Sequence, residues 1–408
     1  ISTYLLLSSI IAFLAGVEVV ANSLIIALIL CWLLDKKLGQ KIKMASQRLE
    51  VWLFASYFLI TVLGMVHTSD VGTGWKFIEM RLLIFLLPPV LYTSSLSKES
   101  VDQLLKAFLF TCAGVIFVGL IISYINYAKD GDTGFFFNDN LVMFFGMKAA
   151  YFAIYINICI VICFYFLQRN FSKYGWYFLL AFLIVAQLLL ATRISILTLI
   201  ILSAVYMTYL ITRQGLKTAT VMLLAVIGLG IASIFLFPQT VNRFKSMFSN
   251  FEYQFDNPNP VNHFNAEVDP DNWNGLTLRL ALWDCGWQVA KKSPVVGVGT
   301  GDYDEQFKDQ LIEVNFIYAQ KLNFGVHNQY LYTMIAFGVV GLSVFLFSIV
   351  YPAFKAYARK NYLFLLVLFI FLMAFLTENV LNRYMGIYPF ALLLPLLYFK
   401  NNGENLQS

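Results

Sequence analysis

The chain has 408 residues, of which 60% are hydrophobic and only 12% are charged, with a mean hydropathy of +0.72 and a formal net charge of +5. A soluble domain needs roughly 25% charged residues to cover its surface, so this composition excludes a soluble globular protein and predicts an integral membrane protein. The net positive charge does not indicate nucleic-acid binding, because the basic residues are confined to alternate connections between apolar runs.

Long apolar runs recur along the chain, and runs of about 18 residues predict transmembrane helices because a helix satisfies its own backbone in hydrocarbon. Four spans are expected first, at 3–17, 19–34, 51–66 and 75–91. Five more are expected at 104–124, 149–167, 177–191, 194–211 and 218–237. The last three are expected at 329–350, 362–377 and 387–399. The sequence therefore predicts an all-α polytopic membrane protein of about twelve spans.

Basic residues occupy every second connection, a pattern typical of cytoplasmic loops. The members of this set are Lys36, Lys37, Lys41, Lys43, Arg48, Lys98, Lys106, Arg169, Lys173, Arg213, Lys217, Lys355, Arg359 and Lys360. This alternation predicts that both termini are cytoplasmic. It divides the chain into nine spans at 1–237, a long extracytoplasmic loop at 238–327, and three spans with a cytoplasmic tail at 328–408.

The long loop has parts of different character. Residues 257–275 are rich in Pro, Asn and Asp, which predicts turns. Residues 278–292 predict an amphipathic helix that ends before Pro294, and residues 297–301 (GVGTG) predict a tight turn rather than a phosphate loop. Residues 302–321 predict another helix. Loops of this length within a compact architecture are usually functional.

Two arginines are candidate anion ligands. Arg193 interrupts the apolar stretch LLLATRISILTLII at an expected outer boundary, where it either contacts lipid headgroups or grips a lipid-linked phosphate. Arg279 opens the amphipathic helix of the loop, where its charge opposes the helix dipole. It therefore reaches either for a ligand or for a carboxylate such as Asp284.

His327 stands directly before an expected membrane helix, where the helix dipole favours a neutral imidazole. A neutral imidazole accepts a proton from a substrate hydroxyl, although a structural cap is the alternative reading. His67, His263 and His327 all fall on the expected outer side, but their spacing is not that of metal ligands. The acidic pairs at 130–132, 269–271 and 302–304 are better explained as turns, so no metal site is predicted.

Several of these residues resemble, in order and spacing, the signature of the O-antigen ligase/polymerase superfamily. The matching residues are Arg193, Arg279, Trp283, Gly286, Trp287, Pro294, Gly297, Gly299, Gly301, His327, Asn328, Tyr330, Leu331, Gly338 and Gly341, followed by the segment Thr377-Glu-Asn. The motifs cover roughly residues 180–400. The sequence around Arg193, Thr-Arg-Ile-Ser, lacks a glycine that is often found there in the family.

The resemblance implies a membrane glycosyltransferase of the GT-C type that inverts configuration and needs no metal or cofactor. Its implied donor is a glycan on undecaprenyl pyrophosphate. His327 would be the general base, while Arg193 and Arg279 would bind the pyrophosphate and stabilise the leaving group. Arg81 and Lys76, near the outer end of a span, are expected either to add to this anion site or to contact headgroups. Trp283, Asn328 and Tyr330 are expected to bind substrate.

The function that the resemblance favours is ligation of O-antigen to a lipid A-core hydroxyl, at the periplasmic side of the bacterial inner membrane. Polymerisation of undecaprenyl-linked repeats and glycan transfer to a protein hydroxyl share the donor site and remain alternatives. A transporter of lipid-linked sugars is the reading from another class. Transporters usually carry charges near the membrane midplane and show repeat symmetry, whereas these charges gather at one face.

Overall fold

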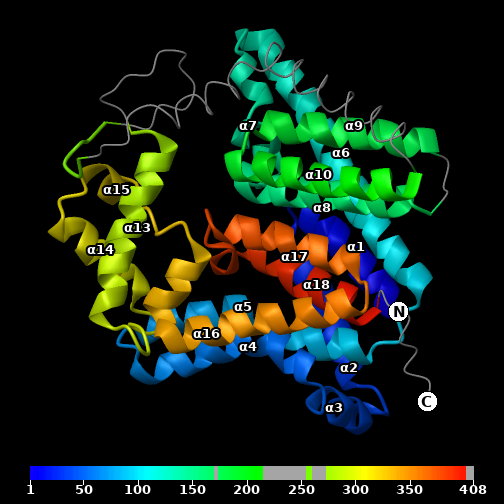
Figure 1. Ribbon diagram of the computed structural model, residues 1–408, viewed down its shortest axis with the longest axis horizontal. Coiled ribbons are helices and arrows are strands. Elements are labelled where there is room, and N and C mark those ends of the chain that lie inside the picture. Colours follow the sequence, from blue (N-terminus) through cyan, green and yellow to red (C-terminus); the bar gives the residue numbers. More distant parts are fainter. Residues whose placement is uncertain (170–172, 215–253, 260–272, 401–408) are drawn as a thin grey trace. The chain divides into compact units, whose positions relative to one another are not determined.

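The computed structural model describes residues 1–169, 173–214, 254–259 and 273–400, and the regular elements in these ranges are all helices (Figure 1). The all-α prediction is therefore confirmed for the described part of the chain. The chain forms two compact units. Unit 1 comprises Ile1–Ala107, Tyr253–Asn259 and Leu278–Ser408, and unit 2 comprises Phe108–Glu252 and Pro260–Thr277.

Unit 1 carries the larger number of the described helices. They are α1 (Ser2–Leu14), α2 (Glu18–Leu33), α3 (Leu38–Ser46), α4 (Leu49–Leu63), η1 (Gly64–His67), α5 (Val71–Thr93), α13 (Gly275–Lys292, from Leu278 onward), α14 (Tyr303–Glu313), α15 (Ile317–Lys321), α16 (Gln329–Ala358), α17 (Tyr362–Phe375), η5 (Val380–Asn382) and α18 (Tyr384–Lys400). Helix α5 packs against α4 and α18, and α4 packs against α16. Apolar and aromatic side chains fill these interfaces; Phe54 of α4, for example, contacts the rings of Phe364 and Tyr398.

Unit 2 is built around α8. Its helices are α6 (Lys98–Asp130, from Phe108 onward), η2 (Thr133–Phe136), α7 (Asp139–Val142), η3 (Met143–Phe145), α8 (Ala149–Leu167), α9 (Lys173–Leu190) and α10 (Arg193–Gln214). Helix α8 packs against α9 and α10, and almost all of its side chains are buried. A helix that is apolar on every side and buried in protein is expected at the centre of a bundle.

Each expected apolar span that falls on described residues is helical, whereas 218–237 lies outside the described residues. Twelve spans are not confirmed. Among the described residues five helices are long and apolar enough to cross a membrane, or six if α2 and α3, which meet at 103°, form one broken span. The remaining apolar helices are shorter, with 10–17 residues each: Ser2–Leu14, Tyr174–Leu190, Tyr362–Phe375 and Tyr384–Lys400.

The described part of the long loop agrees with its expected helices, with one correction. The amphipathic helix forms as α13, but the single helix expected at 302–321 is wrong, because α14 and α15 are separated at Asn315, which has a φ of 56°. A left-handed residue of this kind ends a helix. The predicted turn at 297–301 is confirmed: Gly297 and Gly299 have φ values of 76° and 109°.

Helix α16 is interrupted at Gly338, whose φ of 63° and ψ of −168° are not helical. The loop segment 294–299 supplies hydrogen-bond partners to the backbone around this break. The amides of Val298 and Gly299 donate to the carbonyls of Ile335 and Ala336 at 2.9 and 3.0 Å. In return, the amides of residues 339 and 340 donate to the carbonyls of residues 294 and 295 at 2.8 and 3.2 Å. The loop is thus fastened into α16 by four backbone hydrogen bonds.

Replacing Gly338 with alanine is expected to lower the free energy of unfolding by about 2 kcal/mol or more. The backbone region that Gly338 occupies is essentially restricted to glycine, and an added Cβ would meet the carbonyl of Val295. Thermal unfolding of the purified protein in detergent measures this loss. Gly39→Ala on α3 is the matched control, because a Cβ there meets nothing within 4 Å. Equal melting temperatures for Gly338→Ala and the wild type would contradict the account of the break.

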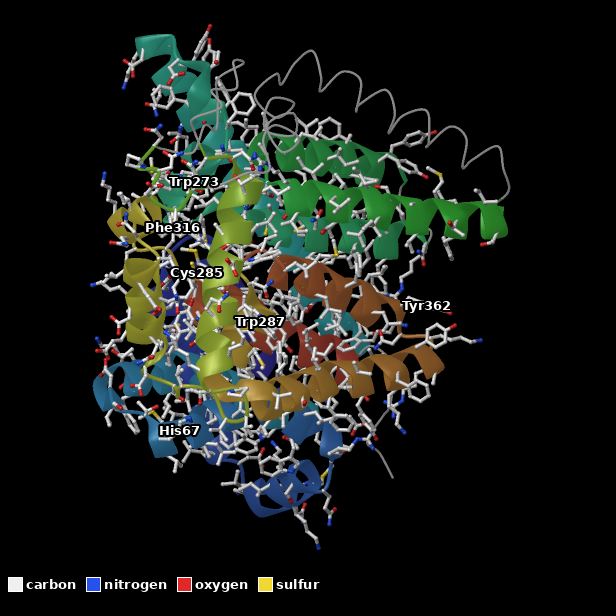
Figure 2. The ribbon with its side chains drawn as sticks, turned by 60° about the vertical axis from the view of Figure 1, so that its left-hand side comes forward. His67, Trp273, Cys285, Trp287, Phe316 and Tyr362 are labelled. Carbon is white, nitrogen blue, oxygen red and sulfur yellow. The ribbon has the colours of Figure 1, made fainter. Side chains whose placement is uncertain are left out.

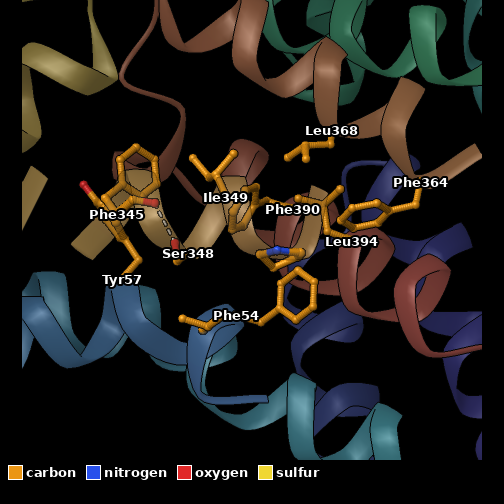
Figure 3. A pocket seen from close by; sticks show the side chains of 11 residues that line it. Phe54, Tyr57, Phe345, Ser348, Ile349, Phe364, Leu368, Phe390 and Leu394 are labelled. Atoms are coloured by element: carbon orange, nitrogen blue, oxygen red, sulfur yellow. Dashed lines mark hydrogen bonds between the residues drawn. The ribbon is translucent and has the colours of Figure 1, made fainter. Parts of the chain in front are cut away.

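A narrow apolar pocket lies among α4, α16, α17 and α18 in unit 1 (Figure 3). Its lining is almost wholly aliphatic and aromatic. The hydroxyls of Tyr57 and Ser348 are engaged elsewhere, with Gln329 and with the carbonyl of Phe345. The pocket therefore offers no uncommitted polar group to a sugar, and it includes none of the candidate site residues.

Candidate functional site

His327 is the last residue of the connection that leads into α16, directly before Asn328, which caps the helix by accepting a hydrogen bond from the amide of Leu331. Its φ of 48° lies in the left-handed region, which residues other than glycine rarely adopt. The indole of Trp283 donates to the carbonyl of His327 at 3.4 Å. These contacts fix the imidazole at the start of α16 with 32% of its side chain exposed.

The imidazole faces a carboxylate from the connection between α17 and α18. Nδ1 of His327 lies 3.3 Å from Oε2 of Glu378, and Oε1 of Glu378 lies 3.6 Å from Nη2 of Arg279. The Glu378 side chain is only 16% exposed. A neutral imidazole that donates its Nδ1 proton to a carboxylate presents Nε2 as a proton acceptor. The three side chains thus combine a proton acceptor, a carboxylate that stabilises the protonated ring, and a cation.

Opposing effects set the pKa of Glu378. Burial acts to raise this pKa, but the hydrogen bond and charge of His327, followed by the charges of Arg279 and Arg383, outweigh burial. The pKa of Glu378 therefore lies below its ordinary value of 4.5, and the group is a carboxylate at neutral pH.

Glu378→Gln is expected to lose less stability than the wild type when the pH is lowered into the acidic range. Because the folded-state pKa is lowered, the stabilisation by ionised Glu378 is complete above its ordinary value of 4.5. This stabilisation is lost as the pH falls through the lowered folded-state value. Melting temperatures recorded from pH about 7 to about 3 should therefore fall less steeply in the variant. Glu313→Gln, which breaks an exposed pair with Lys292, should keep the wild-type slope. Identical slopes for Glu378→Gln and the wild type would refute the assignment.

Buried hydrogen bonds hold the connection that carries Glu378. Oε1 of Gln329 accepts from the amide of Leu381 at 2.7 Å, and Oδ1 of Asn379 accepts from the amide of Asn328 at 2.9 Å. Gln329 and Asn328 both belong to the start of α16. The residues that follow His327 and Glu378 are therefore tied to each other independently of the two reactive side chains.

Arg81 lies at the centre of this network and is wholly buried. Its guanidinium donates to the carbonyl of Leu381 at 3.1 Å and to Oδ1 of Asn382 at 2.7 Å. It also donates to Oγ1 of Thr61 at 2.9 Å and to the hydroxyl of Tyr332 at 3.1 Å. The ring centroids of Tyr57, Phe77 and Tyr332 lie within 5.5 Å of Cζ of Arg81. The sequence suggested an anion site or a headgroup contact for Arg81, but its donors are turned inward to protein acceptors.

The other expected substrate residues of unit 1 lie in different settings. Lys76 is exposed on α5. Trp283 is half-buried against the carbonyl of His327, and Asn328 caps α16. The hydroxyl of Tyr330 donates to the carbonyl of Leu372 at 3.1 Å. Among these four, Trp283 and Asn328 are in contact with His327 or adjacent to it.

Arg193 belongs to unit 2, where it is the first residue of α10 and is half-buried. Its guanidinium lies against Gly275, so that a Cβ at Gly275 would be 2.9 Å from Nη1 of Arg193. Glycine at the start of α13 therefore leaves room for this arginine. A role for Arg193 in anion binding stays a prediction from the sequence.

Sequence reasoning missed the roles of Glu378 and Gln329. The Thr377-Glu-Asn segment contributed to the family resemblance, but no task was assigned to its carboxylate. A usable signal was present, since an ionisable residue between two apolar runs is costly unless it has a partner. Gln329 gave no such signal, because an uncharged amide at the start of an apolar run does not by itself indicate a buried partner.

Among residues 1–169, 173–214, 254–259 and 273–400, no three of His, Cys, Asp or Glu come together in a way that could hold a metal ion. His263, which belongs to the conceivable three-histidine set, lies outside these ranges. The expected turn chemistry is seen at Asp132, which accepts from the amide of Gly134. Asp302 instead accepts from the backbone amides of residues 69 and 70, which are distant in the sequence.

Two comparisons with known proteins bear on this site. The family model described as O-antigen ligase matches residues 178–346, a segment that includes Arg193, Arg279 and His327 but ends before Glu378. An uncharacterized protein of Haemophilus influenzae strain Rd is 32% identical over 96 residues, which is 23% of this chain and 23% of that protein. The chain thus aligns with less than a quarter of this relative.

Proposed function

Because this chain belongs to the O-antigen ligase/polymerase superfamily through residues 178–346, we propose that it is a membrane glycosyltransferase. In this proposal it transfers a glycan from undecaprenyl pyrophosphate to a hydroxyl of lipid A-core, at the periplasmic face of the bacterial inner membrane. The observation that carries the proposal is the contact of one carboxylate, Glu378, with both His327 and Arg279.

His327 is the proposed general base. Nε2 accepts the proton of the acceptor hydroxyl while its oxygen forms a bond to the anomeric carbon of the donor glycan. The bond from that carbon to the pyrophosphate oxygen breaks, and undecaprenyl pyrophosphate leaves with the electron pair. Attack from the side opposite the leaving group inverts the anomeric configuration. Glu378 stabilises the imidazolium that forms, as carboxylates do in other base–acid pairs.

Arg279 is the proposed ligand of the donor pyrophosphate. Its side chain is 32% exposed, and its Nη2 lies 3.6 Å from Oε1 of Glu378, beside the imidazole of His327. A guanidinium in this position stabilises negative charge that develops on the departing phosphate. By the family resemblance, Arg193 is assigned the same task, and exposed Lys76 is a further cation for the lipid phosphate.

Transfer by the purified protein tests the proposal. The protein in nanodiscs is supplied with an undecaprenyl-pyrophosphate glycan and lipid A-core, with and without EDTA, and glycosylated lipid A-core is quantified. We expect product at equal rates in both samples. Failure to form product would refute the function, and loss of product with EDTA alone would refute the metal-independent mechanism.

The phenotype of a gene deletion separates ligation from polymerisation. Loss of a ligase leaves long undecaprenyl-linked chains that are absent from the core. Loss of a polymerase instead leaves lipid A-core that carries one repeat. The first phenotype is expected here, and the second would assign the same chemistry to polymerisation.

A further inference from the structure

Helix α13 is held firmly against unit 1 by one face. Buried side chains line this face, and Gly286 packs so closely against α16 that a Cβ would lie 2.6 Å from Val326 and 3.0 Å from Leu331. The buried members are Ala281, Leu282, Cys285, Val289 and Ala290. The opposite face of α13 is therefore presented in a fixed orientation.

That opposite face is aromatic and polar. Trp287 is 51% exposed, and Trp283, one turn earlier, is half-buried (Figure 2 marks Trp287 on α13). Asp284 and Gln288 lie beside them, with Nε2 of Gln288 donating to Oδ1 of Asp284 at 3.3 Å. The surface thus offers an indole face, carboxylate oxygens and an amide group within two turns of one helix.

This face continues directly from the candidate site. Arg279, Trp283 and Trp287 follow one another at intervals of four residues, so each lies about 6 Å further along the helix axis. Arg279 contacts Glu378, and Trp283 contacts the carbonyl of His327. Trp287 therefore lies roughly one sugar ring beyond the residues that surround the imidazole.

The chemistry of the face suits a saccharide. The C–H face of a sugar ring packs on an indole, while its hydroxyls need both acceptors and donors, which Asp284 and Gln288 supply. Tryptophan is also enriched at membrane interfaces, where its ring lies at the level of the lipid headgroups. Here exposed Lys291 follows one turn after Trp287, and Lys292 pairs with Glu313 at 3.2 Å. Asp284 and Gln288 add hydrogen-bonding groups that a saccharide can use and that lipid hydrocarbon cannot.

We propose that Trp283, Asp284, Trp287 and Gln288 form a saccharide-binding subsite that holds the acceptor glycan beside His327. This inference rests on the proposed function for the identity of the acceptor. The subsite fixes the second ring of the glycan, so that the hydroxyl of the first ring faces Nε2.

Kinetics of Trp287→Ala test the subsite. With lipid A-core as acceptor, the KM for the acceptor should rise about tenfold, while kcat and the KM for the undecaprenyl-pyrophosphate glycan stay unchanged. Trp287→Tyr should have an acceptor KM close to that of the wild type. Trp75→Ala on α5 is the matched control, since Trp75 is 57% exposed and belongs to a different helix. A rise in the donor KM instead would overturn the assignment of the subsite to the acceptor glycan. An unchanged KM for both substrates would overturn it.

Fluorescence provides a test that does not need transfer. The signal of Trp287 is obtained as the difference between the wild type and Trp287→Phe. It should change on addition of core oligosaccharide freed of lipid A by mild acid, and should resist quenching by brominated phosphatidylcholine. Quenching by brominated lipid without a response to oligosaccharide would assign Trp287 to the membrane and overturn the subsite. A response to oligosaccharide in a protein that shows no transfer would refute the proposed function but retain the subsite.

Discussion

His327→Ala is expected to lower kcat for glycan transfer by about 10²- to 10⁴-fold, the usual contribution of a general base. The reason is that Nε2 of His327 is the proton acceptor presented by the contact between Nδ1 and Glu378. The KM values for donor and acceptor should change little, because the loss falls on the transition state. Steady-state rates with saturating donor measure the effect.

The matched control for this variant is His67→Ala, which removes an exposed histidine of the same unit outside the candidate site. It should transfer glycan at the wild-type rate. The transfer rate of Glu378→Gln should lie between those of His327→Ala and His67→Ala, because this variant keeps the imidazole in place but removes the charge that stabilises the imidazolium. Full transfer by His327→Ala would show that the proton acceptor lies elsewhere.

Arg81→Met is expected to lower the free energy of unfolding by about 3 to 5 kcal/mol, from roughly 1 kcal/mol for each of four acceptors left without a donor. Methionine replaces the unbranched stem of arginine as far as the position of Nε, while every hydrogen bond of the guanidinium is lost. The melting temperature in detergent measures this change. Transfer should also slow, because the connection that carries Glu378 loses two of its contacts.

The control for Arg81→Met is Lys76→Met on the same helix. Lys76 is exposed, so its replacement should change stability by no more than about 0.5 kcal/mol. Arg81→Lys separates charge from geometry, because it keeps the cation but cannot reach all four acceptors at once. A melting temperature of Arg81→Met equal to that of the wild type would contradict the central role of the network.

Much of the helical fold was predictable, because apolar runs that cannot be exposed to water must form helices in lipid. The run at 149–167, for example, coincides with α8. The break in α16 was not predictable. Gly338 reads as an ordinary glycine within an apolar run, and only its distant partner segment 294–299 makes the break stable. Periodicity reports which side chains are buried and carries no information on such a backbone partner.

Some residues of the candidate site were predictable from the sequence and others were not. His327 and Arg279 stood out because charged or titratable groups beside apolar runs need a reason to be there. The same argument misled for Arg81, since a buried guanidinium in a membrane protein can be satisfied by carbonyls, hydroxyls and amides instead of a substrate. The partners of Arg81 include Leu381 and Asn382, which lie about 300 residues further along the chain. The sequence around Arg81 therefore cannot show that these partners are present.

The break at Gly338 also constrains the order in which the chain can assemble. Residues 294–299 leave the ribosome before α16 does, so the backbone partners of the break are synthesised first. If α16 entered the bilayer alone, the amides and carbonyls around residue 338 would face hydrocarbon without partners. Helix α16 therefore reaches its stable form only after the loop segment 294–299 has bound to it. Substitutions that disrupt this segment should impair membrane insertion as well as activity.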